Sequence, residues 1–99
     1  MENGEAEEGR GMKRVHLVIF GDVQGVGFRA WVRGQARDLG CVGWVKNRQD
    51  EGVEVVAEGM QVEELVKRCQ KGPDVSLVEK VDTRWSEATG EFVNFSVVY

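Results

Sequence analysis

The stretch of the chain best suited to chemistry is a glycine-rich segment that ends in an arginine. Residues 21–29 read GDVQGVGFR, and the apolar spacing that follows Phe28 is that of a helix. Gly25 and Gly27 allow positive φ angles and a close approach of the backbone to a ligand. The N–H groups of residues 24–29 can then form a concave nest for three phosphoryl oxygens. Arg29 adds a planar, permanently charged guanidinium to the same anion.

Arg29 lies in the first turn of the predicted helix, where acidic residues are normally preferred. The helix dipole is positive there, so a cation costs about 0.3–1 kcal/mol when no anion is bound. The sequence has no Asp or Glu between Val23 and Gly34. Such a local conflict favours an anion site. The other interpretation is a tight strand-to-helix turn with a surface arginine, and the glycine spacing matches neither a Walker loop nor a dinucleotide fingerprint.

The elements that must position this segment follow from periodicity and from turn residues. We expect strands at 14–21, 42–47, 53–58, 77–85 and 92–99, with a Ser86–Gly90 turn between the last two. We also expect a helix from Phe28 to Leu39 and a second helix that begins at Gly59 and stops at Gly72-Pro73. This β-α-β-β-α-β order with one extra strand predicts an α+β fold, the ferredoxin-like split βαβ sandwich. Such a fold has a mostly antiparallel sheet with two helices on one face.

Asn47 is the second candidate site residue, because it ends the second predicted strand. In a split βαβ unit the first two strands run parallel with one strand between them. Their C-terminal ends therefore lie at the same edge of the sheet, about 10 Å apart. We expect the Asn47 amide to face the nest across a gap that fits a phosphoryl group and a water. Asparagine is also a common turn residue, and that interpretation remains open here.

Together these residues closely resemble the acylphosphatase family. The resemblance is carried by GDVQGVGFR, LGCVGWVKN and VEVVAEG, and it runs from about Lys13 to Tyr99. It implies hydrolysis of carboxyl-phosphate anhydrides without a metal or another cofactor. It also implies that Arg29 binds the phosphoryl group and that Asn47 positions the attacking water. The phosphate cradle would be the backbone of Gln24, Gly25, Val26, Gly27, Phe28 and Arg29.

Three features depart from the family pattern. The hairpin usually reads N-x-x-D-G-x-V-E, whereas residues 47–54 read NRQDEGVE, with glycine one place later. This puts the turn type and the aim of Asn47 in question. Cys41 stands where Leu or Ile is more usual, a change that we expect to be tolerated. The acidic segment before Lys13 lies outside the family core.

Composition limits the class of partner. The chain has 99 residues and a net charge of −4, most of it from four glutamates within residues 1–12. We expect residues 1–12 to be a disordered acidic tail and residues 13–99 to be an acylphosphatase-like domain. The nearly neutral body disfavours nucleic acid, and no apolar run is long enough for a bilayer. Without a signal-peptide pattern, the prediction is a cytoplasmic monomer that acts on a small-molecule acyl phosphate.

The remaining reactive side chains are better explained structurally. His16 lies well before the end of its strand, and Cys69 belongs to the apolar stripe of the second helix. The Cys41-to-Arg48 spacing is one residue longer than cysteine phosphatases use, and the cysteines lack the spacing of a zinc site. The acidic residues of the hairpin are typical of a solvated edge. The main alternative function is a non-catalytic phosphate or acyl-phosphate binding module that uses the same cradle.

Overall fold

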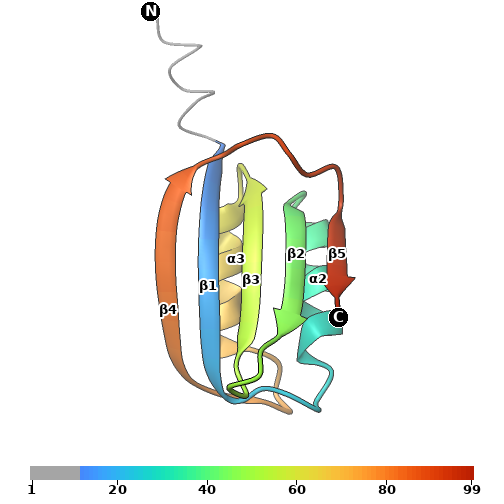
Figure 1. The fold of residues 1–99 in the computed structure, drawn as a ribbon, viewed down its shortest axis with the longest axis vertical. Helices are drawn as coiled ribbons and strands as arrows, with labels where there is room; N and C mark the ends of the chain where they lie inside the picture. The colour runs from blue at the N-terminus through green and yellow to red at the C-terminus, as the bar shows by residue number, and fades with distance from the viewer. Residues whose placement is uncertain (1–11) are drawn as a thin grey trace, which may run out of the picture.

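The predicted ferredoxin-like fold is confirmed by the computed structural model, which describes residues 12–99. Two helices cover one face of a mixed sheet (Figure 1). The elements are β1 (Lys13–Asp22), α2 (Phe28–Asp38), β2 (Val42–Asn47), β3 (Val53–Gly59), α3 (Val62–Lys71), β4 (Leu77–Glu87) and β5 (Phe95–Val98). Of the predicted tail at 1–12, residues 1–11 lie outside the described residues.

The strand order is the feature that positions the site. The 5-stranded sheet runs β4-β1-β3-β2-β5. Both β1 and β2 pair antiparallel with β3, so they run parallel to each other with β3 between them, as expected. Their C-terminal ends, at Asp22 and Asn47, therefore point to the same end of the sheet. Figure 1 shows that the loop after β1 and the β2–β3 turn lie together at that end.

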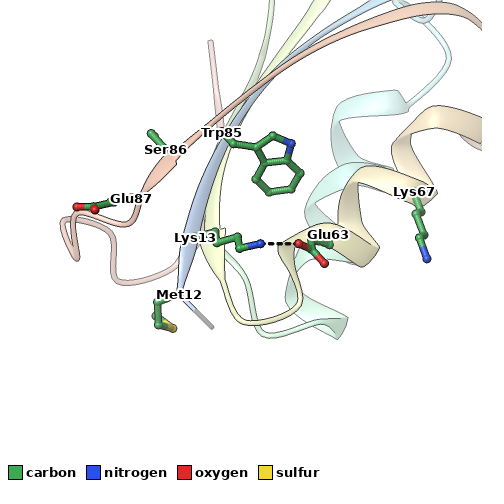
Figure 2. Close-up of a pocket in the computed structure, with 7 residues that line it drawn as sticks. All are labelled: Met12, Lys13, Glu63, Lys67, Trp85, Ser86 and Glu87. Carbon is green, nitrogen blue, oxygen red and sulfur yellow. Dashed lines mark hydrogen bonds and ion pairs between the residues drawn. The ribbon is translucent and has the colours of Figure 1, made fainter. Parts of the chain in front are cut away.

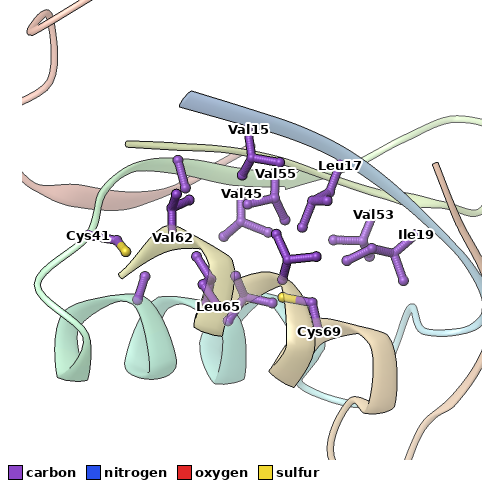
Figure 3. Packing of buried hydrophobic residues seen from close by; sticks show 14 of the residues in the cluster. Val15, Leu17, Ile19, Cys41, Val45, Val53, Val55, Val62, Leu65 and Cys69 are labelled. Carbon is purple, nitrogen blue, oxygen red and sulfur yellow. The ribbon is translucent and has the colours of Figure 1, made fainter. Parts of the chain in front are cut away.

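The core lies between the sheet and the two helices (Figure 3). Alternate residues of β1, Val15, Leu17 and Ile19, are fully buried. They pack against the apolar stripes of the helices, which are Phe28, Val32 and Ala36 on α2 and Val62, Leu65, Val66 and Cys69 on α3. Each Val, Leu, Ile or Phe side chain among them stabilises the fold by about 1.5–3 kcal/mol when it is fully buried. Neither helix of the described part is long and apolar enough to cross a membrane.

The helix ends follow local chemistry, with one correction. Gly40 has φ 69 just past α2, as a left-handed C-terminal cap requires. The second helix, α3, begins at Val62 and not at Gly59. Gly59 instead ends β3, where it pairs with Lys13. Glu63 and Glu64 in the first turn of α3 complement the helix dipole.

The last third of the chain differs most from the sequence-based prediction. β4 continues to Glu87, because Ser86 and Glu87 pair with the start of β1. The predicted Ser86–Gly90 turn is therefore wrong. β5 spans only Phe95–Val98 and pairs in parallel with β2 at the other edge of the sheet. The segment 88–94, which we call the crossover, passes over the end of the sheet to join the two edges (Figure 1).

A buried carboxylate holds the crossover in place. Glu58 of β3 is 1% exposed. Its carboxylate accepts hydrogen bonds from the N–H of Thr89 at 2.9 Å and from the N–H of Gly90 at 3.0 Å. The Arg14 guanidinium also donates to it at 2.9 Å. Burial alone would raise the pKa of Glu58, but these hydrogen bonds lower it to about 2. The carboxylate is therefore charged at neutral pH.

Candidate active site

A small cavity lies at the end of the sheet where β1 and β2 terminate. Its volume is about 160 Å³. It is lined by Val23, Gly25, Gly27, Phe28, Arg29, Ala30, Asn47, Val97 and Tyr99. Arg29 and Asn47 come from separate elements of the fold, the first turn of α2 and the end of β2. The structure thus brings the two principal predicted site residues to one cavity.

The β1–α2 loop exposes its backbone to this cavity. Gly25 and Gly27 both have φ 78, the left-handed conformation that favours glycine. Gly27 is the N-cap of α2. The first N–H groups of a helix have no acceptor within the helix, and in the described chain no side chain caps this one. Since the first turn reads FRAW, without a carboxylate, the helix end presents uncompensated positive charge.

Arg29 rests against an aromatic ring at the rim of the cavity. Its guanidinium carbon lies 4.8 Å from the centroid of the Tyr99 ring, which is within cation–π range. Tyr99 is 95% exposed. From the sequence, Tyr99 is expected only at the end of the last strand. Nothing in the sequence indicates that its ring contacts Arg29, seventy residues earlier in the chain.

Two of the predicted cradle residues have side chains that point elsewhere. Val26 packs against the hydrophobic core. The Gln24 amide nitrogen donates hydrogen bonds to the carbonyl oxygen of Arg48 at 2.9 Å and to that of Gly52 at 2.8 Å. Gln24 thereby connects the glycine-rich loop to the turn that follows Asn47.

That turn is closed by its own hydrogen bonds. The Arg48 N–H donates to the Gly52 carbonyl at 2.8 Å. Asp50 accepts from the Gly52 N–H at 3.1 Å and from the Arg48 guanidinium at 2.9 Å. These contacts, first the Arg48 guanidinium and then the Gly52 N–H, lower the pKa of Asp50 below its ordinary value. Glu51 has φ 75, so the left-handed backbone falls where the family pattern has glycine.

The other reactive side chains lie outside the cavity. His16 contacts the Glu54 carboxylate, with 2.6 Å between Nε2 and Oε2. Both cysteines are free and buried, and burial raises the pKa of Cys69 to about 12. A thiol with that pKa is not a nucleophile at neutral pH. Within residues 12–99, no group of three or more metal-binding side chains comes together.

Two further hollows help to interpret the site. A more open cavity of about 630 Å³ adjoins the first, since Asn47 and Tyr99 line both, and it continues along Lys46 and Arg48. An apolar groove beside Trp85 lies at the opposite end of β1 (Figure 2). There the Lys13 ammonium is paired with Glu63 at 2.7 Å and lies near the indole ring of Trp85. The groove therefore has no share in the arrangement around Arg29.

Comparison with known proteins places this geometry in a family. The acylphosphatase family model matches residues 15–97. An acylphosphatase from Roseiflexus sp. is 47% identical over 90 residues, which are 89% of this chain and 97% of that protein. The crystal structure of acylphosphatase from Bacillus subtilis superposes with a TM-score of 0.84 at 35% identity, over 88% of this chain and 99% of that one. An acylphosphatase structure from Coxiella burnetii gives a TM-score of 0.80 at 33% identity, over 99% of this chain and 100% of that one. With a family model that spans nearly all of the described residues and relatives that align almost end to end, the chain belongs to the acylphosphatase family.

Proposed function

We propose that this protein hydrolyses the carboxyl-phosphate anhydride of small acyl phosphates to a carboxylate and inorganic phosphate. The observation that carries the proposal is that Arg29, an uncapped helix start and Asn47 share one cavity of about 160 Å³. The cavity is larger than a single water needs, so it has room for a phosphoryl group together with an attacking water. The chemistry needs little more than these parts.

The phosphoryl group is held by the backbone N–H groups of residues 24–29 and by Arg29. N–H groups at a helix start and in a glycine-rich nest are good donors to phosphoryl oxygens. The Arg29 guanidinium adds further N–H donors in a planar, permanently charged group. A loose, metaphosphate-like transition state spreads charge over the three equatorial oxygens. The cradle and Arg29 stabilise that charge without the help of a metal.

Asn47 positions the attacking water. Its amide cannot serve as a general acid or base, so its contribution is orientation. The water oxygen forms a bond to phosphorus while the phosphorus–oxygen bond to the acyl group breaks. The electron pair of that bond leaves with the carboxylate, and the proton of the water passes to a phosphoryl oxygen. Because a carboxylic acid has a pKa near 4, the leaving group departs without a protein acid.

The leaving group accounts for the expected substrate class. The adjoining open cavity beyond Asn47 and Tyr99 leaves room for the acyl group. A phosphate monoester has a far more basic leaving group, and the site offers it no acid. We therefore expect benzoyl phosphate to be hydrolysed much faster than p-nitrophenyl phosphate at equal concentration. Equal rates for the two compounds would contradict the proposal.

The proposal also covers the setting in which the enzyme works. We place the activity in residues 13–99, acting in the cytoplasm as a monomer and without a metal. The apolar core formed within those residues supports their folding as one domain, and the positive charge of Arg29 and the helix start supports anion binding without a metal. Turnover of benzoyl phosphate that is unchanged by a chelator, by removal of residues 1–12 and by tenfold dilution would agree with it.

The decisive experiment is steady-state hydrolysis of benzoyl phosphate by Asn47→Ala and Arg29→Ala. We expect Asn47→Ala to lower kcat about a hundredfold or more while inorganic phosphate still inhibits competitively. Arg29→Ala should lose turnover and phosphate inhibition together, because the Arg29 guanidinium binds the phosphoryl group of the substrate and also inorganic phosphate. Asn94→Ala and Arg33→Ala, at exposed positions outside the cavity, control for the two substitutions.

The same assay separates the enzyme from the alternative function. Wild-type turnover no faster than in buffer, with phosphate still bound, would favour the non-catalytic binding module. Full activity of Asn47→Ala would remove the water-positioning role.

A further inference from the structure

The two halves of the site are joined by one side chain outside the cavity lining, that of Gln24. Its amide nitrogen lies 2.9 Å from the Arg48 carbonyl oxygen and 2.8 Å from the Gly52 carbonyl oxygen. Carbonyl oxygens only accept hydrogen bonds, so both amide hydrogens of Gln24 must point at them. We call this pair of hydrogen bonds the amide bridge. The amide bridge joins the β1–α2 loop to Arg48 and Gly52, the two ends of the turn that follows Asn47.

The amide bridge acts on the turn that sets the direction of Asn47. Asn47 is the last residue of β2, and Arg48 follows it directly. The turn must accommodate a non-glycine residue with φ 75 at Glu51, a left-handed conformation that is unfavourable for residues other than glycine. The Gly52 carbonyl, which closes the turn onto the Arg48 N–H, is one of the two groups that Gln24 holds. Without the bridge, the turn can relax away from the loop.

We propose that Gln24 is a positioning residue that fixes the Asn47 amide relative to the phosphoryl group. The inference rests on the proposed function, because it acts through the water held by Asn47. Arg29 and Gly27 belong to the helix start, so phosphate can be held even when the turn is displaced. Loss of the bridge should therefore lower kcat far more than it weakens phosphate binding.

Gln24→Glu and Gln24→Met test the bridge with side chains of nearly the same length. Methionine has no donor, and a carboxylate both lacks donors and repels the two carbonyl oxygens. We expect each variant to lower kcat for benzoyl phosphate about tenfold or more. The inhibition constant of inorganic phosphate should change less than about threefold. Gln49→Glu, at an exposed position of the turn that begins at Arg48, brings the same charge without touching the bridge. Because Gln49 lines the cavity assigned to the acyl group, this control is read on the inhibition constant of inorganic phosphate.

A pH series adds a readout that a structural defect would not move. When the carboxyl group of Gln24→Glu is protonated, it can donate one hydrogen bond to a carbonyl oxygen and partly restore the bridge. The ratio of its kcat to that of the wild type should therefore rise as the pH is lowered from 7 toward 5. The same ratio for Gln24→Met should stay flat. A flat ratio for both variants would contradict the bridge.

A double-mutant cycle with Asn47→Ala decides whether Gln24 acts through Asn47. Once Asn47 has been replaced, Gln24→Glu should cost less than about twofold in kcat. An equal loss in both backgrounds, or a loss of phosphate inhibition as large as the loss of kcat, would overturn the positioning role. A fully active Gln24→Glu would overturn the inference alone, provided that Asn47→Ala is inactive. A fully active Asn47→Ala would overturn the water-positioning role of Asn47 and the inference together, whereas wild-type turnover no faster than in buffer would overturn the proposed function itself.

Discussion

Arg29 lies in the first turn of a helix, where the helix dipole disfavours a cation. The Tyr99 ring beside it offsets this cost. The uncompensated helix start costs about 0.3–1 kcal/mol. The Tyr99 ring, 4.8 Å from the guanidinium carbon, contributes about 0.5–1 kcal/mol at an exposed site. The two effects are of similar size and opposite sign. The sequence indicated only the unfavourable one, because nothing in the spacing of residues placed Tyr99 against this loop.

Glu51 gives a prediction about stability at the scale of one residue. Its φ of 75 suits glycine, so Glu51→Gly should stabilise the protein by about 0.5–1 kcal/mol. For a domain of this size that raises Tm by about 2–8 °C. Thermal unfolding followed by circular dichroism measures the shift. Gln49→Gly is the matched control, because Gln49 does not have a positive φ and the same substitution should lower Tm there.

Gly52 shows why the glycine of the turn stands one place later than in the family pattern. A Cβ at this position would lie 3.1 Å from the Ile19 carbonyl oxygen and 3.2 Å from Phe20 Cε1. The tight space favours glycine at 52, whereas the backbone angle favours it at 51. The sequence showed the displaced glycine but not which of the two constraints it served.

At the scale of elements, the sequence predicted those strand and helix ends that are determined by residues nearby in the chain. The range of β2 was predicted correctly, and α2 was placed within one residue, because glycines and hydrophobic periodicity mark their ends. The errors fall where pairing between distant strands decides. Gly59 belongs to β3 only because Lys13 is opposite it. Ser86 belongs to β4 only because Arg14 is opposite it.

The site divides in the same way. The meeting of Arg29 and Asn47 at one cavity could be predicted, because Arg29 lies in the first turn of a helix and Asn47 ends a strand, and the place of both elements in the split βαβ order is known. The amide bridge of Gln24 and the contact of Tyr99 could not. Both depend on side-chain directions across the end of the sheet, which periodicity does not report.

Glu58 gives a prediction at the level of the crossover. Its pKa in the folded protein is about 2, below the ordinary value of 4.5. Its stabilising effect is therefore complete above about pH 4.5 and is lost as the pH falls toward 2. Glu58→Gln should destabilise the protein by about 1–3 kcal/mol at pH 7 and flatten the loss of stability in acid. Urea unfolding between pH 2 and pH 7 measures both effects.

The control for this prediction is Glu79→Gln, at an exposed position of β4. It removes the same charge without a buried carboxylate and should leave the acid dependence unchanged. Because the crossover lies at the opposite end of the sheet from Asn47, Glu58→Gln should keep its kcat for benzoyl phosphate. A stability profile identical to the wild type would show that the carboxylate does not hold the crossover.

For the whole molecule, we predict a stabilisation by inorganic phosphate that depends on Arg29. A ligand that binds only the folded state at ten times its Kd adds about 1.4 kcal/mol. Phosphate should therefore raise the Tm of the wild type by several degrees, relative to sodium chloride at the same ionic strength. Arg29→Ala should lose most of this shift, whereas Arg33→Ala on the same helix should keep it. An equal shift in Arg29→Ala would place the phosphate elsewhere.

The position of β5 has a consequence for the order of events in folding. The last strand pairs with β2, which lies about half the chain length earlier, and Val97 of β5 and the adjoining Tyr99 line the cavity. Topologies rich in such distant contacts have high contact order and fold slowly, since loop-closure entropy must be overcome before the contacts form. The cavity around Arg29 is thus complete only after the C-terminal strand docks. The rate at which catalytic activity returns during refolding would therefore measure the docking of β5.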